Sequence, residues 1–157
     1  MSLEQNIALL QQFPLFAILD TEQLQLLAFN GETLRFRAGE TLFKEGSTGS
    51  GAIIVVSGEI ALERQYDDGM VEEDTLVAGK MVGELSMITN IDRAISARAL
   101  VSSEVFVISR PLFHRVLNEF PETAARIHKF LGNRLKNAMG DLTGILPQFD
   151  ENLDGNL

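Results

Sequence analysis

The residues best suited to chemistry lie in one stretch in the middle of the chain, residues 82–96. Gly83 permits a tight turn, and the apolar residues after it predict one buried helical turn whose first amides lack partners within the helix. Such amides can hold a phosphate. Arg93 follows nine residues after Glu84, far enough for the chain to loop over and bring a guanidinium onto the same anion.

Glu84 needs a different role, because a carboxylate repels a phosphate. A carboxylate is a good acceptor of hydrogen bonds from sugar hydroxyls. One acceptor, one cation and a group of amides therefore predict a site for a sugar phosphate. The alternative is an internal ion pair between Glu84 and Arg93 that holds this stretch closed.

Composition limits the class of protein that carries this site. The 157 residues, 45% hydrophobic and 22% charged, predict a single ordinary globular domain. A net charge of −9 opposes direct DNA binding. The chain has no cysteine, which excludes disulfides and thiolate chemistry and is compatible with a reducing compartment. No apolar run approaches the roughly 18 residues of a membrane span, so we expect no membrane partner and a soluble, cytoplasmic protein.

The periodicity of the chain indicates which elements position the stretch. Helical spacing predicts helices at residues 3–12 and 21–29, with Asp20 as an N-cap, and at residues 111–118 and 121–139, with Ser109 capping the former. Alternating or β-branched segments separated by glycine bends predict strands between them. These segments are residues 34–36, 41–44, 52–56, 60–66, 71–77, 95–101 and 104–108.

Evenly spaced short strands of this kind are typical of a mainly β fold. We expect an antiparallel eight-stranded jelly-roll barrel, or double-stranded β-helix, with N-terminal helices and two C-terminal helices. Gly140, Gly144 and Pro147 interrupt the helical pattern, and the residues after them are polar and acidic. The predicted domain therefore covers residues 1–139, and residues 140–157 form a short, partly disordered tail.

The last predicted helix carries apolar residues spaced as in the seam of a short coiled coil, which predicts a homodimer through the C-terminal helix. A helix packed back on its own barrel would show similar spacing, and glycines in the helix oppose the seam. The seam residues are Leu131, Leu135, Ala138, Leu142 and Ile145.

The order of elements and the sequence V-G-E-L-S-M-I-x-x-x-x-R-A-I-S at residues 82–96 together resemble the cyclic nucleotide-binding domain family of catabolite activator proteins, protein kinase A regulatory subunits and gated channels. In that family the phosphate-binding cassette resembles F-G-E-L-A-L-I-x-x-x-x-R-A-A-T. Gly39, Gly46 and Gly58 also match the family's bend glycines. The resemblance covers about residues 13–139 and is far more specific than an isolated glycine motif.

The resemblance implies a role for each cassette residue. Glu84, after the turn at Gly83, would accept a hydrogen bond from the ribose 2′-hydroxyl, and Arg93 would bind the cyclic phosphate. Ala94 lies where members that prefer cyclic GMP tend to carry threonine or serine, so the resemblance implies cyclic AMP. The amides that would bind the remaining phosphate oxygens belong to Leu85, Ser86 and Ala94.

The sequence departs from the family at two places. Asp92 and its neighbours replace the glycine and proline often seen before the arginine. The Asp92 carboxylate would repel a phosphate, and an exposed carboxylate would make the binding free energy less favourable by about 1 kcal/mol. Family members cover the base with the last helix, where this chain has Ala138 and Met139. Neither side chain can make the expected hydrogen bond, although Met139 can cover a purine by apolar contact or belong to a core or interface.

These observations favour a regulatory or sensor module over an enzyme. His114 and His128 both lie on the terminal helices, so no metal site, other cofactor or catalytic residue is predicted. The hypothesis is a cyclic nucleotide-binding module in signal transduction, preferring cyclic AMP to cyclic GMP and signalling through its C-terminal helices to an unidentified downstream protein. We expect either an isolated module or a piece of a longer protein. The alternatives are a degenerate relative that works without nucleotide as a dimerisation or docking element, with Arg93 held by Asp92, and a small jelly-roll enzyme.

Overall fold

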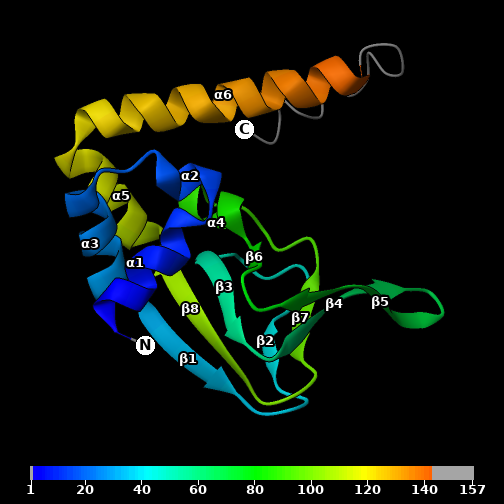
Figure 1. Cartoon of the computed structure of the whole chain (residues 1–157). Coiled ribbons are helices and arrows are strands. Elements are labelled where there is room, and N and C mark those ends of the chain that lie inside the picture. The colour runs from blue at the N-terminus through cyan, green and yellow to red at the C-terminus, as the bar shows by residue number, and fades with distance from the viewer. Residues whose placement is uncertain (1, 143–157) are drawn as a thin grey trace.

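The computed structural model describes the backbone of residues 2–142 and the side chains of residues 2–133. Two antiparallel sheets face each other, and the helices gather at one end of them (Figure 1). The helices are α1 (Leu3–Gln11), α2 (Pro14–Ala17), α3 (Thr21–Asn30), α4 (Glu84–Ile88), α5 (Arg110–Glu119) and α6 (Pro121–Leu142). The strands are β1 (Glu32–Phe36), β2 (Thr41–Phe43), β3 (Gly51–Ser57), β4 (Glu59–Tyr66), β5 (Gly69–Val77), β6 (Met81–Val82), β7 (Ser96–Ala99) and β8 (Ser103–Ser109).

The two sheets have the strand orders β1-β8-β3-β6 and β2-β7-β4-β5. The predicted jelly roll with eight strands is therefore confirmed, as two facing sheets and not as a closed barrel. β4 and β5 form a long hairpin that projects from the body of the domain (Figure 1).

β3 shows why the sequence forms this architecture. Its residues from Ala52 to Val55 are all buried, because successive side chains of a strand point to opposite faces and both faces of β3 are covered. Ala52 and Ile54 pack under the helices, whereas Ile53 and Val55 pack between the two sheets. The strand therefore joins two apolar cores, and burial of its side chains stabilises both layers by about 1.5–3 kcal/mol for each large residue.

The predicted helices are confirmed with small differences at their ends. The Oγ of Ser109 accepts a hydrogen bond from the Leu112 amide at 3.2 Å, as a cap of α5 does. α6 continues to Leu142, three residues past the predicted end, because a glycine in a helix costs only about 1 kcal/mol and does not by itself end it. The domain boundary after residue 139 thus falls within α6 and stays a prediction.

Two short elements were not predicted. α2 has four residues, too few to show a helical period, although Pro14 stands at its favoured first position. β6 has only two residues, too few to show a strand pattern. It is a strand because it pairs with Ile53 and Ile54 of β3. β6 leads directly into Gly83 and α4, so it fixes the entry to the cassette, residues 82–96.

Candidate functional site

Gly83 turns the chain from β6 into α4. Its φ of 81° and ψ of 26° lie in the left-handed region, where a side chain is strained. A Cβ built on Gly83 would also lie 2.1 Å from Nη1 of Arg93 and 2.9 Å from the carbonyl oxygen of Gly51. Glycine therefore serves the turn and also lets Arg93 approach the backbone of the cassette.

α4 is the single helical turn that the sequence predicts. Met87 is fully buried and anchors the turn in the core beneath the helices, and Ser86 is buried beside it. Leu85 is 44% exposed on the opposite side. α4 is thus held by one face, and its N-terminal end starts at the left-handed Gly83.

Arg93 is buried, with 8% of its surface exposed. Its Nη2 donates a hydrogen bond to the carbonyl oxygen of Gly51 at 2.9 Å, and its guanidinium carbon lies 4.3 Å from the centroid of the Phe43 ring. Nη1 has no hydrogen-bond partner in the described part of the chain. Desolvation lowers the pKa of Arg93, but a guanidinium still remains charged in proteins. The site therefore holds a buried positive charge with unused hydrogen-bonding capacity.

No carboxylate among residues 2–133 forms an ion pair with Arg93. Asp92 is exposed, and its Oδ1 accepts a hydrogen bond from the Thr48 hydroxyl at 3.4 Å. Neither the Glu84–Arg93 pair nor the Asp92–Arg93 pair that the sequence left open is thus formed in this structure. The positive charge of Arg93 remains uncompensated by these side chains.

The loop before β3 holds the backbone of Arg93 in place. The Arg93 amide donates to the carbonyl oxygen of Ser47 at 2.7 Å, and the Gly46 amide donates to the carbonyl oxygen of Arg93 at 2.8 Å. The Gly49 amide donates to the carbonyl oxygen of Ile91 at 2.9 Å. The sequence predicts only an irregular loop here, because these partners are separated by more than forty residues along the chain.

Arg110 is a residue of the site that the sequence did not indicate. Its Nη1 donates to the carbonyl oxygens of Gly49, Ser86 and Thr89 at 2.8, 3.4 and 3.4 Å. Nε2 of His114 lies 2.7 Å from the carbonyl oxygen of Ile88. Carbonyls at the end of a helix lack partners within it, and α5 supplies these partners to α4. The cassette and α5 are therefore joined by polar contacts as well as by packing.

The structure brings only some of the predicted site residues together. Gly83 lies against Arg93, whereas Ala94 is exposed. Glu84 lines a hollow of about 350 Å³ with Phe13, Pro14, Leu15, Met81 and Phe130, and Arg93 lines a different cavity. The side chains of Ala138 and Met139, the predicted cover of the base, lie outside the described residues.

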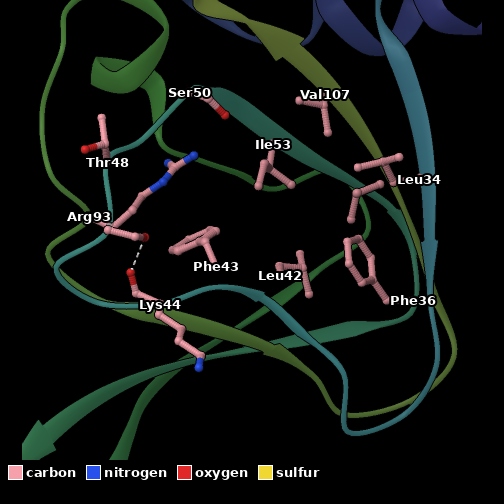
Figure 2. Close-up of a pocket in the computed structure, with 12 residues that line it drawn as sticks. Leu34, Phe36, Leu42, Phe43, Lys44, Thr48, Ser50, Ile53, Arg93 and Val107 are labelled. Atoms are coloured by element: carbon pink, nitrogen blue, oxygen red, sulfur yellow. Dashed lines mark hydrogen bonds between the residues drawn. The ribbon is translucent and has the colours of Figure 1, made fainter.

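The cavity at Arg93 lies between the two sheets and has a volume of about 430 Å³. Figure 2 shows the Arg93 guanidinium reaching into it between Ser50, Ile53 and Phe43. We refer to it as the inter-sheet cavity. Its lining residues are Leu34, Phe36, Leu42, Phe43, Lys44, Ser47, Thr48, Ser50, Ile53, Arg93, Val105 and Val107.

The described residues contain neither a cluster of metal ligands nor a helix that could span a membrane. No group of three or more histidine, cysteine, aspartate or glutamate side chains there is placed to hold a metal ion. Within the same residues, no helix has the length and apolar character needed to cross a membrane.

A jelly roll in which a left-handed glycine opens a helical turn against a buried arginine offers a place for an anion. Residues 33–120 match the family model described as the cyclic nucleotide-binding domain. The chain belongs to this family, which confirms the predicted resemblance to the catabolite activator and protein kinase A regulatory types.

The relatives of this chain differ in size and in name. A cyclic nucleotide-binding-like protein from Brucella abortus has a solved structure that is 39% identical, with a TM-score of 0.69, over 73% of this chain and 98% of that one. The cyclic AMP receptor protein of Thermus thermophilus is 27% identical over 88% of this chain and 63% of that protein. Lysophospholipase NTE1 of Chaetomium globosum is 28% identical over 73% of this chain, which corresponds to only 8% of that protein.

Proposed function

We propose that this protein is a regulatory module that senses a cyclic nucleotide and prefers cyclic AMP. The observation that carries the proposal is the buried guanidinium of Arg93, whose Nη1 lies beside Gly83 and has no hydrogen-bond partner among the described residues. A buried charge that has no opposite charge beside it is unfavourable by several kcal/mol. A phosphate at this place would supply both the opposite charge and two acceptor oxygens.

The other cassette residues would complete the binding of the ligand. Leu85, Ser86 and Ala94 would donate backbone amides to the phosphate, and Glu84 would accept a hydrogen bond from the ribose. Since Glu84 and Arg93 line different hollows, we infer that the ligand draws α4 and Arg93 around itself as it binds. The exposed methyl group of Ala94 offers no hydroxyl to a guanine, which supports the preference for cyclic AMP.

Signalling would pass from the cassette to the C-terminal helices. Arg110 and His114 connect α4 to α5, so a shift of α4 changes the contacts that position α5 and, after it, α6. α6 would carry Ala138 and Met139 toward the base and present a new surface to a downstream protein. We place this module in the cytoplasm as a homodimer without enzymatic activity of its own.

A second candidate function is a docking element that binds no nucleotide. The observation that favours it is the exposed carboxylate of Asp92, next to Arg93 in the chain and replacing the residues usual in the family. The negative charge of Asp92 would make the binding free energy of a phosphate less favourable by about 1 kcal/mol. In that case the cassette would be a structural remnant, and partner binding would not depend on Arg93.

Calorimetric titration with cyclic AMP and cyclic GMP tests the proposal. We expect saturable binding, tighter for cyclic AMP, that Arg93→Ala abolishes. Arg37→Ala, which removes the same charge from an exposed position directly after β1, is the matched control and should bind as the parent protein does. Binding that survives Arg93→Ala would contradict the assignment of Arg93.

The same titration on Asp92→Ala separates the two candidates. If the parent protein is silent toward both nucleotides and Asp92→Ala binds, Asp92 blocks the site and the docking function holds. Silence from every folded variant would exclude both cyclic nucleotides as ligands.

A further inference from the structure

The inter-sheet cavity has a chemical character of its own. Most of its lining side chains are aliphatic or aromatic, and they come from β1, β2, β3 and β8. Leu34, Phe36 and Val107 are only half-buried, although they point between the sheets, so this end of the sandwich is not filled by the protein itself. A volume of about 430 Å³ is within the range of roughly 300–1,000 Å³ that small-molecule sites have.

The polar groups of the cavity lie together at one end. Figure 2 places Arg93, Lys44, Thr48 and Ser50 on one side, and Leu34, Phe36 and Val107 on the other. Of the described acidic side chains, none lines the cavity. The end that holds Arg93 is therefore positive, and the opposite end is apolar.

The cassette and the inter-sheet cavity share Arg93 alone. Gly83, Glu84, Leu85 and Ala94 are all absent from the lining of the cavity. No carboxylate or amide side chain is present there to pair with the hydroxyls of a sugar or the edge of a purine. Among Leu34, Phe36 and Val107, the polar groups of a nucleoside would find no side-chain partner, at a cost of about 1–3 kcal/mol for each one.

From this arrangement the geometry points to a second ligand: we propose that the inter-sheet cavity binds a small amphiphilic monoanion, a carboxylate with an alkyl body. The carboxylate pairs with the Arg93 guanidinium near Ser50, and the alkyl body fills the space among Leu34, Phe36 and Val107. The apolar lining supplies affinity by burial, and the guanidinium fixes the orientation of the ligand.

The shared arginine couples this ligand to the cassette. A carboxylate bound to Arg93 neutralises the charge that would otherwise attract a phosphate beside Gly83. By linkage, each anion weakens the binding of the other by the same factor. The alkyl carboxylate is therefore an antagonist of whatever phosphate the cassette binds, although its own binding does not depend on a nucleotide.

Titration calorimetry with octanoate, in the absence of nucleotide, tests the proposal. Octanoate should bind saturably with one site per chain, and octylamine, which has the same chain and the opposite charge, should not. Arg93→Gln should weaken octanoate binding by about 10- to 100-fold, the effect of losing a charge-assisted hydrogen bond. A parent protein that is folded but silent toward octanoate would overturn the proposal, even if it binds cyclic AMP.

A variant that fills the cavity tests the location of the ligand. Leu34→Trp should weaken octanoate binding about tenfold or more by occupying the apolar end, and Val107→Phe serves the same purpose if Leu34→Trp does not fold. Val77→Trp, at a 45% exposed position on β5, is the control and should leave octanoate binding unchanged. Octanoate affinity that is equal in the folded filling variants and the parent would place the ligand elsewhere and overturn the proposal.

Competition then tests the shared arginine. Saturating cyclic AMP should lower the apparent affinity for octanoate in the parent protein. If both ligands bind and neither affects the other, Arg93 is not shared and the proposed orientation of the carboxylate is wrong. Failure of cyclic AMP to bind at all contradicts only the nucleotide function, since octanoate is measured independently.

Discussion

At the scale of single residues, two glycines with left-handed backbone conformations differ in the space around them. Comparing them separates the cost of backbone strain from the cost of a steric clash. Gly39 has a φ of 90° and nothing within 4 Å of the place where a Cβ would stand. Gly83 has a φ of 81° and Nη1 of Arg93 only 2.1 Å from that place. The two positions therefore share the conformational cost of a side chain but differ in the displacement it would cause.

We predict that Gly39→Ala lowers the free energy of unfolding by about 1 kcal/mol, the cost of strain alone. Gly83→Ala should cost about 1–2 kcal/mol more and should also reduce nucleotide affinity at least about tenfold, because the methyl group displaces the guanidinium. Urea denaturation and calorimetric titration measure the two effects. Equal costs in both variants, with nucleotide affinity retained, would show that Arg93 does not depend on the space at Gly83.

Some residues of the site could be predicted from the sequence, and others could not. Glu84 and Arg93 stand at a fixed spacing in one segment, and a local motif predicts them. Arg110 is recognised only in three dimensions, because the Gly49 carbonyl that it contacts is 61 residues away in the chain. The same holds for the open Nη1 of Arg93, since burial and the absence of a partner are properties of packing.

At the scale of elements, Arg110 connects the cassette to α5. We predict that Arg110→Gln lowers the free energy of unfolding by about 1.5–3 kcal/mol, the range for hydrogen bonds to a charged group. Amide hydrogen exchange of residues 84–90 should become faster, because α4 loses donors to its last carbonyls. Thermal or urea denaturation and exchange detected by mass spectrometry measure these changes.

Arg115→Gln on the same helix is the control for Arg110→Gln. The Arg115 side chain is 59% exposed, and among the described residues its ion pair is with Glu119, four residues on, an interaction of about 0.3–0.5 kcal/mol. Arg115→Gln should leave amide hydrogen exchange in α4 unchanged. If Arg110→Gln behaves like Arg115→Gln, α4 and α5 are held together by apolar packing and not by the guanidinium.

Glu63 should make the pairing of β4 with β7 depend on pH. Arg98 donates to both carboxylate oxygens of Glu63 at 3.0 Å and lowers the pKa of Glu63 below its usual 4.5. A lowered pKa in the folded state gives stability that is present above the unfolded pKa and lost as the pH falls through the folded one. The ion pair therefore stabilises the sheet at neutral pH and not in acid.

We predict that Glu63→Gln destabilises the protein at pH 7 and that this effect disappears as the pH is lowered below the folded pKa of Glu63. Urea denaturation across the pH range measures the difference between parent and variant. Glu59→Gln, at an exposed position of the same strand, removes an equal charge and should show a much smaller dependence. A Glu63→Gln effect that stays constant down to pH 2 would show that the ion pair contributes nothing.

The elements themselves were predictable where their own residues carry a pattern. β3 reads as a continuous apolar run because both of its faces are buried, and α5 reads as a helix because Ser109 caps it. β6 has two residues and exists because β3 pairs with it. Whether the strands form a closed barrel or two facing sheets also depends on long-range strand pairing. No local pattern of residues predicts that pairing.

At the scale of the whole molecule, the predicted signalling and the predicted homodimer both depend on the C-terminal helix, α6. The first part of α6 packs on its own chain: Ile127 is buried, and Phe130 and Leu131 are half-buried against the core beneath the helices. Leu131, the first residue of the predicted seam, thus already has partners within the domain. The side chains of the other seam residues lie beyond the described part of the chain, so the homodimer stays a prediction that depends on them.

Light scattering after size-exclusion chromatography tests the dimer, and we expect the mass of two chains. Leu135→Glu, at a predicted seam position, should give the mass of one chain, whereas Asn133→Glu, at an exposed position of the same helix, should leave the dimer intact. Since each chain carries a net charge of −9, repulsion between copies should make the dimer tighter at 0.5 M salt than at 0.05 M. A single-chain mass under all conditions would mean that α6 acts within its own domain. In that case α4, Arg110 and α5 would signal by exposing or covering α6 within one molecule, and not by changing an interface between two molecules.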